Sequence, residues 1–302
     1  MALAYSRREM MVSLCAREIT DLETIFIGVG APLLAGMVAL RTHAPNVTMV
    51  FEAGGIGAVS RRIPWTISDS PTTDNALAAM EMWRVMADTQ RGYVNVGMLG
   101  GAQIDKFGNL NSTVIMGENG TYDDPEVRLP GSGGANDVAS LCGRTVIIMR
   151  LEKRRFVERV DYITSPGYLA GGEARKLSGL KGGGPVAVVT DRAVFRFDQL
   201  TKEMYLAEIF PGITVEEIRQ NIGWDLKISP EMRIAEPPTE REVMTMRELD
   251  PLGIILGGKG VLQAESFDDF YRLMKQSYEA DGICCDSVCG GITFRPFILP
   301  QS

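Results

Sequence analysis

Two short apolar segments with a helical segment between them constrain the fold of this chain more than any other feature of its sequence. Residues 24–29 and 47–51 contain β-branched and aromatic side chains, which favour a half-buried pleated strand. Apolar residues with helical spacing follow Pro32, which suits the first helical position, and continue to Leu40. A strand, a helix and a second strand in succession predict parallel strands joined by a right-handed crossover. We therefore predict an α/β fold with a mostly parallel sheet.

Patterns along the rest of the chain predict more elements of the same two kinds. The Asp191-Arg192 pair is expected to turn one strand into an antiparallel hairpin near the edge of the sheet. Thr214 and Glu217 form a capping box, which predicts a helix that ends at Gly223. The other expected strands are 94–99, 146–149, 186–190 and 194–197, and the other expected helices are 8–20, 75–88 and 236–250.

The composition of the chain shifts near Asp250-Pro251. Charged sequence of helical type precedes this point, and the glycine-rich segment 252–260 follows it. We therefore predict one domain over residues 1–250 and an appended segment over residues 251–302. A helix is expected in the appended segment at about 266–279, but nothing in its sequence indicates a role.

The overall composition excludes several classes of protein. The chain of 302 residues has 31 basic and 38 acidic side chains, a net charge of −7, and no basic run, so it is poorly suited to bind nucleic acid. No apolar run approaches the roughly 20 residues of a membrane span, and the apolar stretch 10–16 is too weak for a secretory signal. Five cysteines, an odd number, argue against a disulfide framework. We expect a soluble, cytoplasmic protein.

Few residues in the sequence could hold a metal or a nucleotide. His43 is the single histidine, which excludes most histidine-based triads and metal sites unless His43 itself takes part. Cys284, Cys285 and Cys289 cluster without a zinc-binding spacing. The turn at Gly28–Pro32 lacks the third glycine of a dinucleotide fingerprint. These features argue against a metal site and against a dinucleotide-binding turn.

A lone carboxylate, Glu52, stands at the end of the second predicted strand. Gly54, Gly55 and Gly57 follow it, and glycine at such positions allows unusual backbone angles and the close approach of a ligand or another backbone. A charged side chain at the mouth of a buried strand is typical of a nucleophile or general base. The alternative is that Glu52 caps a turn or forms a salt bridge. We take Glu52 as the catalytic candidate and Gly54 as a candidate substrate-binding residue.

Two glycine-rich loops are further candidates for the site. Residues 131–136 could expose several backbone N–H groups that bind an anion or the oxygen of a tetrahedral intermediate, although a flexible loop is the alternative. Residues 100–113 follow a strand, at the edge of a sheet where α/β proteins bind ligands. Gly101 and Gln103 are therefore candidate substrate-binding residues. The polar side chains of this loop have a spacing that favours an ordered loop over a metal site.

Six motifs, in order and at similar spacing, resemble the β-subunits of the class I (family I) CoA-transferases, and within that family the glutaconate branch. The resemblance runs from about residue 8 to about residue 250. Each motif alone is weak evidence for the resemblance, but six motifs in the same order are strong evidence. They are the strand end at Glu52, Gly100–Asp105 with Gly108–Thr113, Gly131–Asn136, Glu152–Phe156, Asp161–Gly167 and Val188–Asp191.

The resemblance implies an open α/β sheet with flanking helices, a partner α-subunit in an α2β2 or larger assembly, and ping-pong exchange through a covalent glutamate. Glu52 falls on the nucleophile position, and Gly134 and Ala135 fall where the family supplies oxyanion-hole N–H groups. Glu118-Asn-Gly120 resembles the nucleophile motif of other branches, but it lies in a variable insert between two matched motifs. CoA is a substrate in this family, so no cofactor is implied.

These features predict the β-subunit of a transferase that moves CoA from an acyl-CoA to a carboxylate, expected to be a dicarboxylate. The same scaffold could instead serve an acyl-CoA hydrolase, a C–C hydrolase or a decarboxylase, or the chain could be a non-catalytic subunit; retention of Glu52 favours transfer.

The sequence departs from the glutaconate branch at 53–55, Ala-Gly-Gly, which bears on the acyl group that fits. Arg154 and Arg155 could bind a CoA phosphate or a substrate carboxylate, or form a solvated or interface-facing pair.

Overall fold

A computed structural model of the chain describes residues 4–60, 62–64, 66–67, 69–251, 253–257, 268 and 272. The helix expected at 266–279 lies outside the described residues except at positions 268 and 272. Cys284, Cys285 and Cys289 lie outside them as well. The domain boundary at residue 250 therefore stays a prediction.

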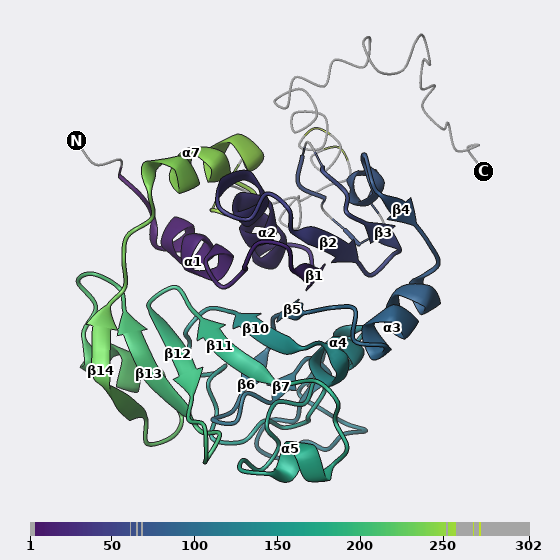
Figure 1. Ribbon diagram of the computed structural model, residues 1–302. Helices are drawn as coiled ribbons and strands as arrows, with labels where there is room; N and C mark the ends of the chain where they lie inside the picture. The colour runs from purple at the N-terminus through teal and green to yellow at the C-terminus, as the bar shows by residue number, and fades with distance from the viewer. Residues whose placement is uncertain are drawn as a thin grey trace.

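An open sheet of ten strands, in the order β14-β13-β12-β11-β10-β5-β1-β2-β3-β4, runs through the middle of the molecule (Figure 1). Strands β11, β10, β5, β1 and β2 form a continuous parallel block. Antiparallel pairs flank the block on both sides, so the prediction of an open, mostly parallel sheet is confirmed. The block consists of β1 (Thr24–Ile27), β2 (Thr48–Phe51), β5 (Val96–Leu99), β10 (Arg144–Ile148) and β11 (Pro185–Val189). The flanking strands are β3 (Gly55–Ile56), β4 (Ala78–Ala79), β12 (Ala193–Phe197), β13 (Met204–Ile209) and β14 (Lys227–Ile234).

Helices cover both faces of the parallel block, and two glycines allow them to come close. Phe26 and Gly97 are register partners, so they share one face, and Ile27 points to the other. A methyl group on Gly36 would lie 2.2 Å from Ile27, and one on Gly97 would lie 2.3 Å from Val138. The helices that carry Gly36 and Val138 therefore pack on opposite faces. They are α2 (Ala31–Thr42) and α4 (Ala135–Leu141), and Figure 1 shows α1 (Arg7–Ala16) and α7 (Glu240–Leu249) beside α2.

The helix predicted at 75–88 is wrong over its first half. It begins at Met82, as α3 (Met82–Gln90), and the residues before it form β4. The N–H groups of Leu77 and Met80 donate to the carbonyls of Ile56 and Gly54 at 2.9 and 3.0 Å. Pairing with the chain after β2 therefore overrides the helical spacing of the apolar residues.

The predicted hairpin is confirmed as β11–β12, but it does not lie at the edge of the sheet, because β13 and β14 extend the sheet beyond it. Strand β14 is largely exposed and contains Pro230, as edge strands often do, so it lacks the alternating pattern that reveals a strand. The helix capped by Thr214 and Glu217 also forms, as α6 (Val215–Arg219), and it ends four residues before the expected Gly223.

Two ion pairs join α7 to the N-terminal helix α1. The guanidinium of Arg17 donates to both carboxylate oxygens of Glu242, at 2.9 and 2.7 Å. Arg247 donates to Glu9 at 2.7 Å. Burial by itself would raise the pKa of both carboxyl groups, but the arginines and the backbone N–H groups at the helix starts hold each pKa below its ordinary value. These contacts place the end of the predicted domain against its beginning.

We predict that Glu242→Gln lowers the free energy of unfolding by about 2 kcal/mol at pH 7, because it removes a charged hydrogen-bond partner of Arg17. A lowered pKa stabilises the fold above the ordinary glutamate value, and this contribution is lost as pH falls through the lowered value. Thermal unfolding between pH 3 and pH 7 should therefore show the variant and the native protein converging at acid pH. Glu240→Gln, an exposed residue of the same helical turn, should leave the curve unchanged. A constant difference at all pH values would contradict the assignment.

Candidate active site

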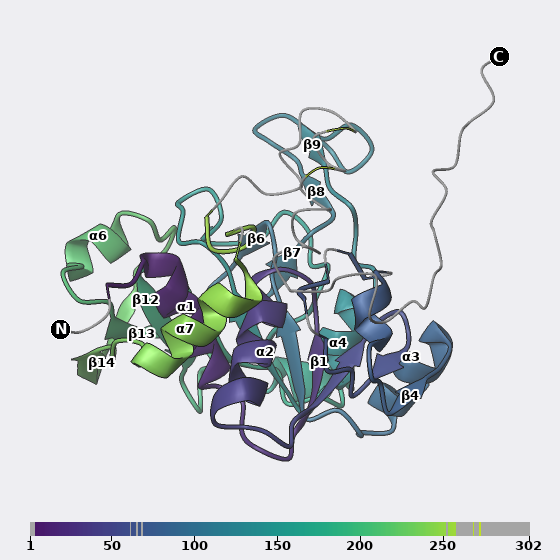
Figure 2. The ribbon, with the colours of Figure 1, turned by 90° about the horizontal axis from the view of Figure 1, so that it is seen from above.

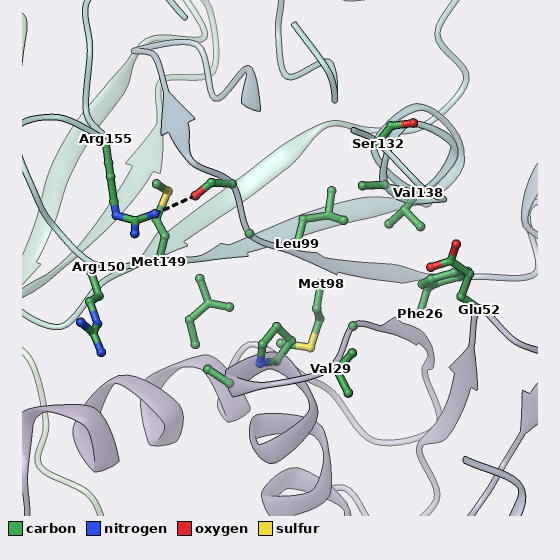
Figure 3. Close-up of a pocket in the computed structure, with 17 residues that line it drawn as sticks. Phe26, Val29, Glu52, Met98, Leu99, Ser132, Val138, Met149, Arg150 and Arg155 are labelled. Carbon is green, nitrogen blue, oxygen red and sulfur yellow. Dashed lines mark hydrogen bonds between the residues drawn. The ribbon is translucent and has the colours of Figure 1, made fainter. Parts of the chain in front are cut away.

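A cavity of about 450 Å³ lies at the carboxyl ends of β1, β2, β5 and β10 (Figure 3). This edge of a parallel sheet is where α/β proteins place their ligands. The charged side chains of its lining are Glu52, Arg150 and Arg155, and the apolar ones are Phe26, Val29, Ala31, Pro32, Met98, Leu99, Ala135, Val138, Ile148 and Met149.

Glu52 is the first residue after β2, and its half-buried carboxylate lines the cavity (Figure 3). The backbone turns there, with the N–H of Gly54 donating to the carbonyl of Phe51 at 3.0 Å. The N–H of Gly134 donates to Oε1 of Glu52 at 3.0 Å. The structure thus brings together two residues that lie 82 positions apart and that the sequence motifs assigned to one site.

The loop 131–136 delivers this donor directly before α4. Gly133 has φ +48°, and Gly134 is the N-cap residue of the helix. Ala135 lines the cavity, but its N–H donates to the carbonyl of Ser132 at 2.9 Å. Of the two expected oxyanion donors, one therefore faces Glu52 and the other is held within a turn.

The glycines after Glu52 make room for a neighbouring backbone. Gly54 is buried at φ +121°, and a methyl group on it would lie 1.7 Å from the carbonyl oxygen of Met80. A methyl group on Gly55 would lie 1.9 Å from the carbonyl oxygen of Thr72. Gly54 does not belong to the lining of the cavity. The close approach that the glycine pattern predicted is therefore made by residues 72–80.

The loop after β5 divides into a part that lines the cavity and a part that is locked by hydrogen bonds. Gly101 lines the cavity, and its carbonyl accepts from Arg155 at 3.2 Å. Gln103 is 5% exposed and exchanges hydrogen bonds with Asn111 and Asp161, away from the cavity lining. Its side chain is fully engaged in holding the loop.

Asp105 and Asn109 complete this hydrogen-bonded network. The carboxylate of Asp105 accepts from the side chain and the N–H of Asn109, and Asn109 in turn accepts from the N–H groups of Gly167 and Leu169. Burial raises the pKa of Asp105 in spite of these donors. The interpretation of the polar residues as loop-ordering is confirmed.

Glu118 occupies a different part of the molecule. It is exposed between β8 (Val114–Ile115) and β9 (Val127–Arg128), whose hairpin projects from the body in Figure 2. It does not line the cavity. Its position favours Glu52 over Glu118 as the reactive carboxylate.

The sequence patterns did not indicate Arg150 as a site residue, and they left the role of Arg155 open. Arg150 stands just beyond the end of β10, as Glu52 does beyond β2. The signal for Arg150 in the sequence is a charged side chain directly after the predicted strand 146–149. Arg155 reaches the cavity because its guanidinium turns back onto Gly101.

Within the described part of the chain, no helix is long and apolar enough to cross a membrane. Among the same residues, no three histidine, cysteine, aspartate or glutamate side chains gather as a metal ion would require. Within the described residues, the charged side chains that line the cavity therefore do not form a metal-binding arrangement.

The chain belongs to the coenzyme A transferase family, because the model of that family matches residues 8–221. The resemblance inferred from the six motifs is thus confirmed, and the chain is that of an enzyme of the transferase class. It is 37% identical to the B-subunit of 3-oxoadipate CoA-transferase of Pseudomonas knackmussii, over 82% of this chain and 94% of that protein. It is 34% identical to the B-subunit of glutaconate CoA-transferase of Acidaminococcus fermentans, over 82% of this chain and 93% of that protein.

Two solved structures show the same fold. Glutaconate coenzyme A-transferase from Acidaminococcus fermentans matches with a TM-score of 0.78 at 33% identity, over 85% of this chain and 99% of that chain. The decarboxylase AibA/AibB matches with a TM-score of 0.71 at 25% identity, over 83% of this chain and 97% of that chain. One scaffold therefore carries proteins named for two different reactions.

We predict that Gly54→Ala destabilises the protein by about 3 kcal/mol or more, because the added methyl group overlaps the Met80 carbonyl. Gly92→Ala is the matched control. Gly92 also has a positive φ, +86°, but a methyl group there meets nothing within 4 Å, so the cost is limited to about 1–2 kcal/mol of backbone strain. Denaturant unfolding of both variants checks this. Equal losses of stability in the two variants would show that the close approach of Met80 is not the reason for glycine at position 54.

We predict that Gly134→Ala lowers the rate of CoA transfer at least about 10-fold, because its methyl group would lie 3.1 Å from Oε1 of Glu52 and displace the carboxylate from the Gly134 N–H. The same methyl group would lie 2.6 Å from the flexible end of Met86. Met86→Ala alone should keep its activity, and the double variant should remain slow. Recovery in the double variant would assign the loss to Met86 instead.

Proposed function

We propose that this chain is the β-subunit of a heteromeric CoA-transferase that moves CoA from an acyl-CoA to a carboxylate, with Glu52 as the nucleophile. The observation that carries the proposal is the placement of the Glu52 carboxylate in the cavity, with a backbone N–H donor 3.0 Å from one oxygen. Oε1 is held by this bond, which leaves Oε2 to react.

The relatives support a proposal for the partner and for the substrate class. The proteins from Pseudomonas knackmussii and Acidaminococcus fermentans are named as the B-subunits of their enzymes, and the alignments cover more than nine-tenths of each. We therefore propose an α-subunit as partner, in an α2β2 or larger assembly in the cytoplasm. Both relatives are named for short dicarboxylic acids, 3-oxoadipate and glutaconate, so we propose a dicarboxylate for one of the two exchanging acids.

The first half of the reaction transfers CoA to the enzyme. Oε2 of Glu52 attacks the thioester carbonyl, the C–S bond breaks, and a mixed anhydride and CoA thiolate result. The thiolate then attacks Cδ of Glu52 and releases the donor acid as a carboxylate, which leaves a glutamyl-CoA thioester. The acceptor carboxylate reverses these two steps, and no net proton or water is consumed. The covalent relay divides one difficult exchange into easier steps.

Gly134 has a clear role in this sequence of steps. When the thiolate attacks Cδ of Glu52, negative charge develops on the oxygen that already accepts from the Gly134 N–H. One oriented donor of this kind is worth roughly 3–4 kcal/mol in the transition state. Ala135 could add a second donor if its hydrogen bond to Ser132 opened.

The apolar lining protects the intermediates. Water would hydrolyse the anhydride, so the reaction requires a site that excludes it. Side chains such as Leu99 and Met149 surround the space between the charged groups of the cavity. An α-subunit that covers the open side would complete the exclusion.

Hydrolysis and decarboxylation are the alternatives, and the likeness to the decarboxylase AibA/AibB is the observation that supports the second. The presence of Glu52 at the nucleophile position favours transfer. Release of free CoA without an acceptor acid would indicate hydrolysis, whereas dependence on an acceptor would support transfer.

We predict that borohydride reduction of the α/β complex, after incubation with acyl-CoA, modifies Glu52 alone. Glu52→Gln should lower kcat on the order of 10⁴-fold or more, because an amide cannot act as the nucleophile. Glu118→Gln is the matched control, since Glu118 is an exposed carboxylate on another part of the surface, and it should transfer CoA normally. Peptide mapping that places the label elsewhere, or full transfer by the Glu52→Gln variant, would refute the mechanism.

A further inference from the structure

The cavity carries opposite charges at its two ends. The carboxylate of Glu52 lies at one end, and the guanidinium groups of Arg150 and Arg155 lie at the other (Figure 3). Glu52 and Arg150 follow parallel strands of the same sheet, so the strand order sets their separation. Strands β10, β5, β1 and β2 lie side by side in that order, which makes three strand spacings between the first and the last. Three spacings are about 14 Å between backbones.

The guanidinium of Arg155 is fixed in place. Its Nε donates to Glu152 at 3.1 Å and its Nη1 donates to the carbonyl of Gly101 at 3.2 Å. Since a guanidinium has five N–H donors, these two bonds orient the group and leave further donors for a ligand. Figure 3 shows the side chain directed into the cavity.

Arg150 carries a charge that the described residues do not neutralise. No hydrogen bond or ion pair joins its guanidinium to the described residues, and it is exposed at the rim of the cavity. Glu152, the acidic partner nearby, accepts from both Arg154 and Arg155 through one oxygen, Oε2. This end of the cavity therefore has positive charge available for an anion.

The space between the two charged ends is apolar. Strand β5 supplies Met98 and Leu99, strand β10 supplies Ile148, and Met149 directly follows β10. A hydrocarbon segment can bury its surface there, and an anionic group attached to it would reach the guanidinium groups.

We propose that Arg150 and Arg155 bind the distal carboxylate of a dicarboxylic acyl group while Glu52 reacts with its other end. This inference rests on the proposed function and assigns its dicarboxylate specificity to two residues. Arginine pairs with carboxylates in a bidentate, charge-assisted geometry. An acyl group without the distal carboxylate would leave both guanidinium groups unpaired with substrate.

The phosphates of CoA are a weaker match for these arginines. The thioester must lie at Glu52, and the long pantetheine arm separates it from the nearest phosphate. The apolar walls also suit the hydrocarbon part of an acyl group better than the amide groups of pantetheine. Every acyl-CoA carries the same phosphates. Loss of a phosphate contact should therefore affect all acyl-CoA substrates, whereas loss of a contact to the distal carboxylate should affect only dicarboxylic acyl groups.

The test compares glutaryl-CoA with valeryl-CoA, which has a methyl group in place of the distal carboxylate, with acetate as acceptor and the α/β complex as enzyme. Arg150→Met should lower kcat/KM for glutaryl-CoA about 30- to 100-fold and change that for valeryl-CoA less than about 2-fold. Arg150→Lys should recover part of the loss. Arg154→Met is the matched control, because the Arg154 side chain is 76% exposed and does not line the cavity. It should affect neither substrate.

Equal losses for both thioesters would assign Arg150 to CoA or to folding and overturn the inference, as would no loss with glutaryl-CoA. The proposed function is judged separately, by transfer from valeryl-CoA and by the label on Glu52. Calorimetry with glutarate and valerate on the Glu52→Gln complex adds a readout that needs no turnover. Glutarate should bind more tightly than valerate, and Arg150→Met should abolish the difference; equal binding of the two acids would also overturn the inference.

Discussion

Strands β10, β5, β1 and β2 run parallel, and this alignment determines where the functional groups of the site lie. Parallel strands end at the same edge of a sheet, so residues that directly follow them gather there whatever their distance in sequence. Glu52 directly follows β2, and Arg150 is the second residue after β10. The helices packed on the two faces hold the strands in this register, with Gly36 and Gly97 permitting the close approach.

Two groups of glycines have different tasks in the site. Those after Glu52 admit the backbone of residues 72–80, which supports the strand end from outside the cavity. Those before α4 present the N–H of Gly134 to the carboxylate. One loop therefore supports the reactive side chain, and another stabilises the developing charge. A substitution in either loop can be tested separately from a substitution in the other.

The scaffold alone does not decide the reaction, since proteins named as CoA-transferase and as decarboxylase share it. On a shared fold, the residues of the site rather than the fold determine the reaction. In this chain they include a carboxylate with one oxygen held and one free, an apolar middle, and guanidinium groups opposite. Such a site suits an acid that carries charge at both ends.

Periodicity and motif order were enough to predict the α/β class, the parallel block, the nucleophile candidate Glu52 and the family. These signals can be read along the chain without knowledge of contacts between distant segments. The sequence could not reveal β4, because strand pairing there overrides a helical pattern of apolar residues. It could not reveal β14, because that largely exposed strand lacks an alternating pattern. It also could not show that Gly54 and Gln103 are engaged in packing and loop order, or that Ala135 donates to Ser132. Which groups face a cavity depends on contacts between distant segments, and only the tertiary structure decides these. The same contacts placed the two cavity arginines opposite the carboxylate.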